Sequence, residues 1–278
     1  MYKSLANGLL TLVPLLALPS LALADEHCKF SEPRTLDLQL AGAKAVVFEV
    51  AQHDLRLQAT PGTAAHLQGR ACASSADALG QLTLTQQRSG DKLVVTLKRE
   101  GRNFSFGNSY AYLDIAGSVP DDVMVQLKVG SGDAEVSGAS ALSADIGSGD
   151  VKARAIKGQL TASVGSGDLE IDGAGALHVL SVGSGDVKAE RIGGAARVGS
   201  VGSGDLELRQ VRGDVRIDSI GSGDVELTDI GGDVALGSIG SGDLSVRNVQ
   251  GGLKVATRGS GDISHRDVRG TVDVPKAK

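Results

Sequence analysis

The residues most able to do chemistry in this 278-residue chain are eight aspartates, each of which ends a Gly-Ser-Gly-Asp tetrapeptide. The tetrapeptides begin 17 to 19 residues apart. A carboxylate can bind a metal ion, act as an acid or base, or accept hydrogen bonds, so its role depends on what surrounds it. The eight residues are Asp133, Asp150, Asp168, Asp186, Asp205, Asp224, Asp243 and Asp262.

The residues between the tetrapeptides predict two short strands in each repeat. Apolar and polar side chains alternate with period two, as in residues 225–227 and 234–236, and this alternation is typical of strands. A uniform repeat of this length predicts one coil of a solenoid, in which each strand pairs in parallel with its equivalent in the next coil. We therefore expect an all-β fold, a single-stranded parallel β-solenoid (β-helix-like or β-roll-like) of about eight regular coils. The corner glycines are expected to supply positive φ angles.

One outward position in each repeat tests the register of the coils. It lies two residues after each tetrapeptide aspartate, and its first five occupants alternate in charge. Stacking the coils in register places each Glu beside a Lys, which stabilises each neighbouring pair by roughly 0.2–1 kcal/mol. The occupants are Glu135, Lys152, Glu170, Lys188, Glu207, Glu226, Ser245 and Ser264.

Stacking also places the eight aspartates in one row. Neighbouring carboxylates about 4.8 Å apart repel by roughly 0.9 kcal/mol even in water. Either hydrogen bonds from turn N–H groups and Ser hydroxyls offset this repulsion, or a cation lies between the coils. The calcium-binding β-roll nonapeptide places its Asp differently, and Ca²⁺ prefers six to eight oxygen ligands. We predict a structural turn ladder without metal or cofactor, and Ca²⁺ binding is the alternative.

The amino terminus predicts export. Residues 1–24 contain a short apolar stretch, interrupted by two prolines, and end in small residues, which is typical of a secretory signal peptide. We expect cleavage between Ala24 and Asp25, a periplasmic or secreted chain, and no transmembrane segment after cleavage. Cys28 and Cys72 are the two cysteines of the chain. An oxidising compartment favours a disulfide between them, and two free buried thiols are the alternative.

Composition divides the mature chain into two regions. Residues 25–129 hold all its aromatic residues and predict an N-terminal β-rich capping region, whereas residues 130–278 form the repeat solenoid. Residues 103–112 hold four aromatic side chains, which either form a contact patch or fill the core of the cap. Four residues near the carboxyl end are expected to block further strand pairing there: Arg258, His265, Pro275 and Lys276.

The uniform coils argue against catalysis. Solenoid hydrolases build their sites on long loops with paired acids and aromatic sugar platforms, and this array has neither long loops nor aromatic residues. His178 and His265 are isolated in the sequence, so nothing marks either as a base. The net charge of −5 argues against binding to nucleic acid. We predict that the protein is a monomer and not an enzyme.

The repeats resemble a known family. Each Gly-Ser-Gly-Asp precedes Val, Leu, Ile or Ala, and residues 119–125 lead into the array. These features are similar to the GSGD β-strand repeats of bacterial proteins of unknown function named "putative adhesins", including head-GIN-like proteins, over about residues 35–275. The resemblance implies an exported β-solenoid and carries no catalytic or ligand residues.

Together, the residues and the resemblance predict an exported, non-catalytic β-solenoid of the bacterial cell envelope. Its expected role is structural, adhesion-like or partner-binding, toward an envelope or cell-surface component that the sequence does not identify. Two alternatives remain, a calcium-stabilised β-roll-type binding protein and an envelope-stress sensing protein.

Overall fold

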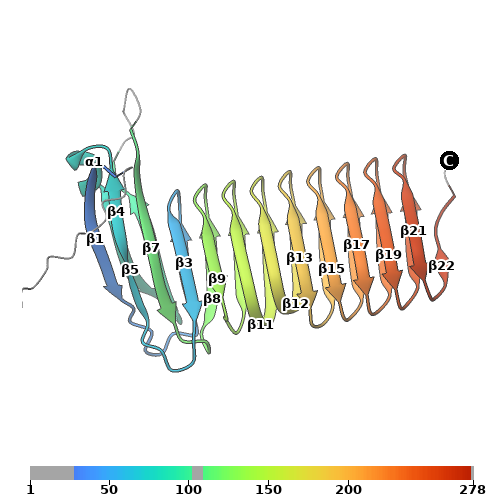
Figure 1. The fold of residues 1–278 in the computed structure, drawn as a ribbon, viewed down its shortest axis with the longest axis horizontal. Coiled ribbons are helices and arrows are strands. Elements are labelled where there is room, and N and C mark those ends of the chain that lie inside the picture. The colour runs from blue at the N-terminus through green and yellow to red at the C-terminus, as the bar shows by residue number, and fades with distance from the viewer. Residues whose placement is uncertain (1–27, 102–108, 277–278) are drawn as a thin grey trace, which may run out of the picture.

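The computed structural model describes residues 28–101 and 109–276. The expected signal peptide, residues 1–24, and its cleavage site lie outside the described residues. Figure 1 shows an elongated molecule whose coils lie side by side, from a cap at one end to the carboxyl terminus at the other. Within the described ranges, no helix is long and apolar enough to cross a membrane.

Two parallel ladders of strands form the array, which confirms the predicted β-solenoid. Ladder A contains β9 (Ala134–Ser137), the first halves of β11 (Val151–Val164) and β12 (Leu169–Val182), β13 (Val187–Ile192), β15 (Leu206–Val211), β17 (Val225–Ile230), β19 (Leu244–Val249) and β21 (Ile263–Val268). Ladder B contains β8 (Met124–Val129), β10 (Leu142–Ile146), the second halves of β11 and β12, β14 (Ala196–Val201), β16 (Val215–Ile220), β18 (Val234–Ile239), β20 (Leu253–Arg258) and β22 (Val272–Asp273).

Each coil turns twice between the ladders. The chain passes from ladder B to ladder A through a Gly-Ser-Gly-Asp corner, and it returns to ladder B through a second corner. In β15 the side chains of Leu206, Leu208 and Val211 point inward and are at most 1% exposed. The opposite strand β16 buries three of its six residues in the same pattern. The core is therefore a thin layer of aliphatic side chains, as the scarcity of aromatic residues predicts.

The outward position confirms the predicted register. Lys152 lies in register with Glu135 on one side and with Glu170 on the other. The Nζ atom of Lys152 is 3.6 Å from Oε2 of Glu170. Two residues further along the strand, Arg154 pairs with Glu135. Ladder A thus neutralises much of its own surface charge.

The corner glycines have a different role from the one predicted. None of the described tetrapeptide glycines has a positive φ, so that expectation is wrong. Their backbones instead stack closely on the corner of the preceding coil. A Cβ added at Gly204 would lie 1.8 Å from the carbonyl oxygen of Gly185, and Gly223 and Gly242 are equally crowded. Glycine is required here because any side chain would collide with backbone.

Positive φ occurs elsewhere, in one residue of each coil near the end of the ladder A strand. This position, five residues after each tetrapeptide aspartate, is skipped in the pairing register of the ladder. Non-glycine residues rarely adopt this left-handed conformation, although Asn and Asp tolerate it best. In one instance, Asn248 donates a hydrogen bond from Nδ2 to Oδ1 of Asp229 at 2.6 Å. The residues are Gly138, Ala155, Gly173, Arg191, Gln210, Asp229, Asn248 and Asp267.

Antiparallel strands close the amino-terminal end. β1 pairs with β4, β4 pairs with β7, and β5 pairs with β6, all antiparallel. The bounds are β1 (Phe30–Asp37), β4 (His66–Ala73), α1 (Ala76–Gly80), β5 (Leu82–Ser89), β6 (Lys92–Arg99) and β7 (Ala111–Val119). These antiparallel strands are not repeated in the array, and they cover its amino-terminal end.

Two strands of the capping region join the parallel ladders. β2 (Ala45–Val50) lies between β6 and β8, and β3 (Asp54–Ala59) lies between β7 and β9. Residues 51–54, Ala-Gln-His-Asp, occupy the corner between them, and the N–H of Gly132 donates to the carbonyl of Ala51 at 3.2 Å. A coil without the tetrapeptide therefore precedes the eight tetrapeptide corners.

Candidate functional site

The tetrapeptide aspartates form one exposed row at the starts of the ladder A strands. Seven of them, Asp133 through Asp243, accept the backbone N–H of the aspartate in the next coil on Oδ1, at 2.8–3.2 Å. The backbone also links the corners in the opposite direction, because the carbonyl of Asp168 accepts the N–H of Val151 at 2.9 Å. Charge-assisted bonds of this kind offset the repulsion between neighbouring carboxylates.

The row ends differently at its two ends. Among the described residues no further coil follows Asp262 to supply an N–H, and Nη2 of Arg258 lies 2.8 Å from its Oδ1. The Nε atom of Arg258 donates to the carbonyl of Gly261 at 2.7 Å. At the other end Asp54 extends the row, since it lies in register with Asp114 of β7 and next to Asp133. Burial, together with the carboxylates of these two residues, raises the pKa of Asp54.

A shorter carboxylate row lies at the second corner. Oδ1 of Asp214 accepts the N–H of Asp233 at 2.9 Å, and Oδ1 of Asp233 accepts the N–H of Gly252 at 2.7 Å. In residues 28–101 and 109–276, no three His, Cys, Asp or Glu side chains gather as a metal site would require. The geometry of both rows is that of a backbone clamp, in which one carboxylate oxygen of each residue joins two coils.

A groove that the sequence did not predict follows the second corners. It has a volume of about 870 Å³ and runs along six successive coils, from β11 to β19. One wall consists of the positive-φ residues, such as Arg191 and Gln210, and the other consists of corner residues such as Lys157 and Arg212. Buried aliphatic side chains, including that of Ile230, lie between the walls. The wall residues differ from coil to coil, so no repeated motif marks the groove.

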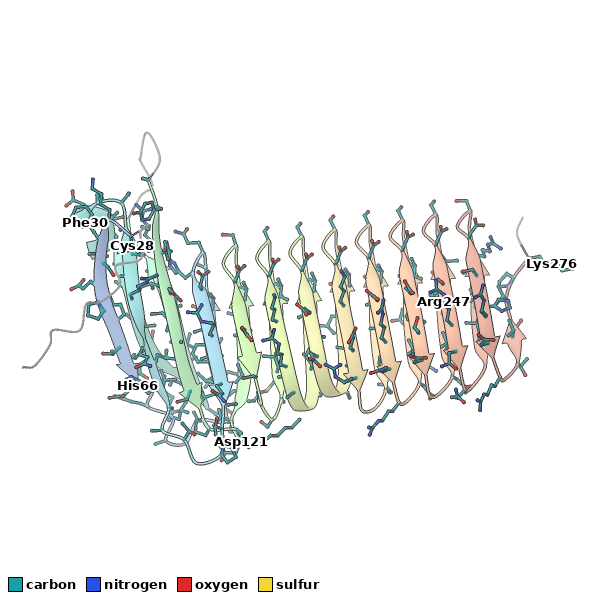
Figure 2. All side chains as sticks on the ribbon, viewed as in Figure 1. Cys28, Phe30, His66, Asp121, Arg247 and Lys276 are labelled. Atoms are coloured by element: carbon teal, nitrogen blue, oxygen red, sulfur yellow. A yellow bond between two sulfur atoms is a disulfide. The ribbon has the colours of Figure 1, made fainter. Side chains whose placement is uncertain are left out.

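Charged groups line part of this groove. Lys157 pairs with Asp121, which Figure 2 labels near the junction with the cap, and Arg191 pairs with Asp172. Arg212 belongs to no ion pair of the described residues. The groove is long and shallow, and such a shape suits an extended ligand better than a compact one.

The two histidines singled out in the sequence lie apart from the aspartate row. His178 lies on the outer face of ladder B, in register with Thr161 and Arg197. His265 is exposed in β21, in register with the buried Val246. Neither position is at a tetrapeptide corner.

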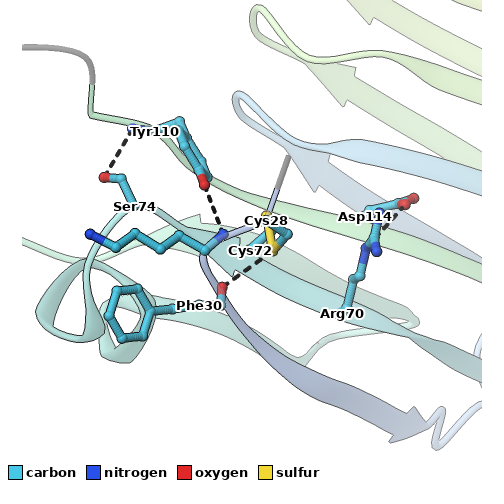
Figure 3. Close-up of a disulfide and its surroundings, with 8 residues drawn as sticks. Cys28, Phe30, Arg70, Cys72, Ser74, Tyr110 and Asp114 are labelled. Atoms are coloured by element: carbon cyan, nitrogen blue, oxygen red, sulfur yellow. Dashed lines mark hydrogen bonds and ion pairs between the residues drawn. A yellow bond between two sulfur atoms is a disulfide. The ribbon is translucent and has the colours of Figure 1, made fainter. Parts of the chain in front are cut away.

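The cap holds the two cysteines together. Figure 3 shows the disulfide between Cys28 and Cys72, whose Cα atoms are 5.6 Å apart, beside Tyr110. The hydroxyl of Tyr110 accepts the N–H of Lys29 at 2.9 Å, and its ring centroid lies 6.3 Å from that of Tyr112. Phe104 and Phe106, the other aromatic residues of the predicted contact patch, lie outside the described residues. The two tyrosines are half-buried, and Tyr110 holds the amino-terminal segment through its bond to Lys29.

Comparison with known proteins identifies the family. The family model described as Toastrack DUF4097 matches residues 43–274. The chain belongs to the Toastrack DUF4097 family. The match begins at residue 43, so it leaves out β1 and covers the other capping strands as well as the repeats. Among curated proteins, none matches the chain.

Three solved structures are similar to the chain at low identity. A "putative adhesin" from Bacteroides fragilis NCTC 9343 is 14% identical with a TM-score of 0.43, and the match covers 89% of this chain and 98% of that one. A "putative lipid binding protein" from Parabacteroides distasonis ATCC 8503 is 16% identical with a TM-score of 0.46, over 87% and 96% of the two chains. A "putative adhesin" from Parabacteroides merdae ATCC 43184 is 8% identical with a TM-score of 0.43, over 85% and 96%.

Proposed function

We propose that the protein is an exported, non-catalytic β-solenoid that binds another component of the bacterial cell envelope in an adhesion-like role. The observation that carries the proposal is the groove along the second corners of six coils. A binding surface of this length needs a rigid support, and the hydrogen-bonded corners supply one in every coil. The signal-like residues 1–24 support export.

The same features support the absence of catalysis. Catalytic sites combine a nucleophile or base with groups that orient it and a pocket that excludes water. In the aspartate row seven of the eight carboxylates are engaged with the backbone of the next coil, and the row faces solvent. The coils add no loop that could cover a substrate in the described array.

Co-sedimentation with isolated bacterial envelopes tests this function. We expect saturable binding of the purified exported chain, and we expect Arg212→Glu to weaken it at least fivefold because the change reverses a charge in the groove. Arg216→Glu is the matched control, since it makes the same change on the outer face of ladder B and leaves the groove intact. Non-saturable binding, or equal loss in both variants, would contradict the proposal. So would a hydrolase activity of the chain on an envelope polymer.

A further inference from the structure

His53 is a buried titratable residue at the boundary between cap and array. It occupies the corner between β2 and β3, at the position held by the second glycine in the tetrapeptide corners, and it is 0% exposed. In the array an identical neighbouring corner leaves no room for a Cβ. No tetrapeptide corner precedes His53 in the stack, because β6 and β7, the partners of β2 and β3 on that side, are not joined by a tetrapeptide.

The hydrogen bonding of His53 requires a neutral ring. The backbone N–H of Leu113, in β7, donates to Nδ1 at 3.2 Å. Nδ1 therefore carries no proton, and the proton of the neutral ring is on Nε2. Nε2 is buried and has no partner among the described residues. An added proton on Nδ1 would place two donors against each other and a charge inside an apolar core.

We propose that protonation of His53 opens the junction between cap and array in acid, while the array itself stays folded. The proton comes from solvent and binds Nδ1, and the bond from the Leu113 N–H breaks. β7 carries this N–H and also pairs with β3, so the separation begins between these two strands. This acid-induced opening goes beyond the proposed binding function, because it concerns the attachment of the cap to the array.

The charged groups nearby do not compensate an imidazolium. Asp54 adjoins His53, and its raised pKa reflects burial and the carboxylates of Asp133 and Asp114. Asp114 is engaged by Arg56 at 2.5 Å and faces Arg70 at 3.9 Å. Burial lowers the pKa of His53 from 6.5 to about 4, which agrees with the geometry.

The lowered pKa of His53 determines how closure of the junction depends on pH. A pKa that is lower in the closed junction than in the open one means that the open form binds the proton more tightly. Closure is therefore favoured above pH 6.5 and weakens as the pH falls toward 4. The opening equilibrium should rise about tenfold by roughly pH 5.5 and approach about 300-fold well below pH 4. Protonation of Asp54 acts in the opposite direction at low pH.

Amide hydrogen exchange of the exported chain between pH 7 and pH 4, corrected for intrinsic rates, tests the proposal. We expect amides of β3 and β7 to lose protection about tenfold or more, and amides of β15–β19 to keep theirs. His53→Gln should abolish the acid response, because Gln can accept the Leu113 N–H and does not titrate. His66→Gln is the matched control, since His66 is only half-buried and its Nδ1 contacts Asp37 at 2.6 Å.

Three outcomes would overturn the proposal. In the first, the His53→Gln variant opens at the same pH as the unmodified chain. In the second, cap and array lose protection together. The third outcome is needed if the His53→Gln variant does not fold, and it comes from a measurement on the unmodified chain. Imidazole NMR of the unmodified chain then measures the His53 titration directly, and a pKa near 6.5 in the closed state would contradict the proposal.

Discussion

The corner at residues 51–54 and the tetrapeptide corners connect the same two ladders under different packing constraints. Gly204 has a copy of itself one coil away, and only 1.8 Å separates its ideal Cβ from the oxygen of Gly185. His53 has no such copy before it, and its whole side chain is buried there. Repetition thus fixes the residue type where coils touch, whereas the unrepeated corner can hold a titratable side chain.

The largest effect is expected from a side chain at a repeated corner. Gly204→Ala should destabilise the array by at least about 3 kcal/mol, because the new Cβ collides with backbone that has no alternative position. Chemical denaturation measures the loss. Hydrogen exchange should show it concentrated in the coils of β13 and β15.

Gly80→Ala is the control for that change. Gly80 ends α1 in the cap, and no atom lies within 4 Å of its ideal Cβ, so we expect a change within about 0.5 kcal/mol. If Gly204→Ala and Gly80→Ala changed the free energy of unfolding equally, close stacking of the coils would not explain why the corners contain glycine.

The second prediction concerns the cap. The disulfide joins cysteines 44 residues apart, and the chain-entropy model assigns a loop of this length about 4 kcal/mol. Replacing Cys28 and Cys72 with serine should therefore lower the stability of the cap by a few kcal/mol. Hydrogen exchange is the measurement, and β1, β4 and β7 should lose protection while β15 to β19 do not.

This result would separate the two regions energetically. Solenoids behave approximately as nearest-neighbour arrays, so damage at one end should fade along the coils. Equal loss of protection in the cap and in the distant coils would show instead that the molecule unfolds as one cooperative unit. The double serine variant keeps the size of both side chains close to that of cysteine.

The sequence was sufficient to predict the coils of the array, but it did not predict the coil of β2 and β3 that precedes them. Lys152 and its glutamate neighbours predicted the register correctly, because side chains on a repeated strand must stack on their equivalents. The coil of β2 and β3 lacks the tetrapeptide, so the repeat search missed it. For the same reason the sequence did not connect Asp54 and Asp114 to the aspartate row.

Two further features depend on backbone geometry that residue types do not reveal. Glycine serves both positive φ and close approach, and only the structure shows that Gly204 serves the second. The positive-φ row is occupied by residues as different as Ala155, Arg191 and Gln210, so no motif marks it. The groove follows this row, and it was missed for the same reason.

A smaller effect is expected at the positive-φ row, where the array carries strain that glycine would relieve. Gln210 has a φ of 55°, a conformation that costs a non-glycine residue about 1–2 kcal/mol. Glycine removes this cost but adds about 0.5–1 kcal/mol of chain entropy, so Gln210→Gly should stabilise the array by up to about 1.5 kcal/mol. The thermal midpoint measures the gain. Asn248→Gly should give no gain, since Asn tolerates this conformation and bonds Asp229.

Calcium is expected to have the smallest effect. In the aspartate row Oδ1 of Asp186 is already bonded to the N–H of Asp205, and each coil step adds a single carboxylate, fewer oxygens than Ca²⁺ prefers. A site with a millimolar dissociation constant would add about 1.4 kcal/mol in ten millimolar Ca²⁺, which shifts the midpoint by a few degrees. We expect equal midpoints in Ca²⁺ and in chelator. A rise in Ca²⁺ that Asp205→Asn removes would instead favour the calcium-stabilised β-roll, because Asn keeps the backbone bond and loses only the charge.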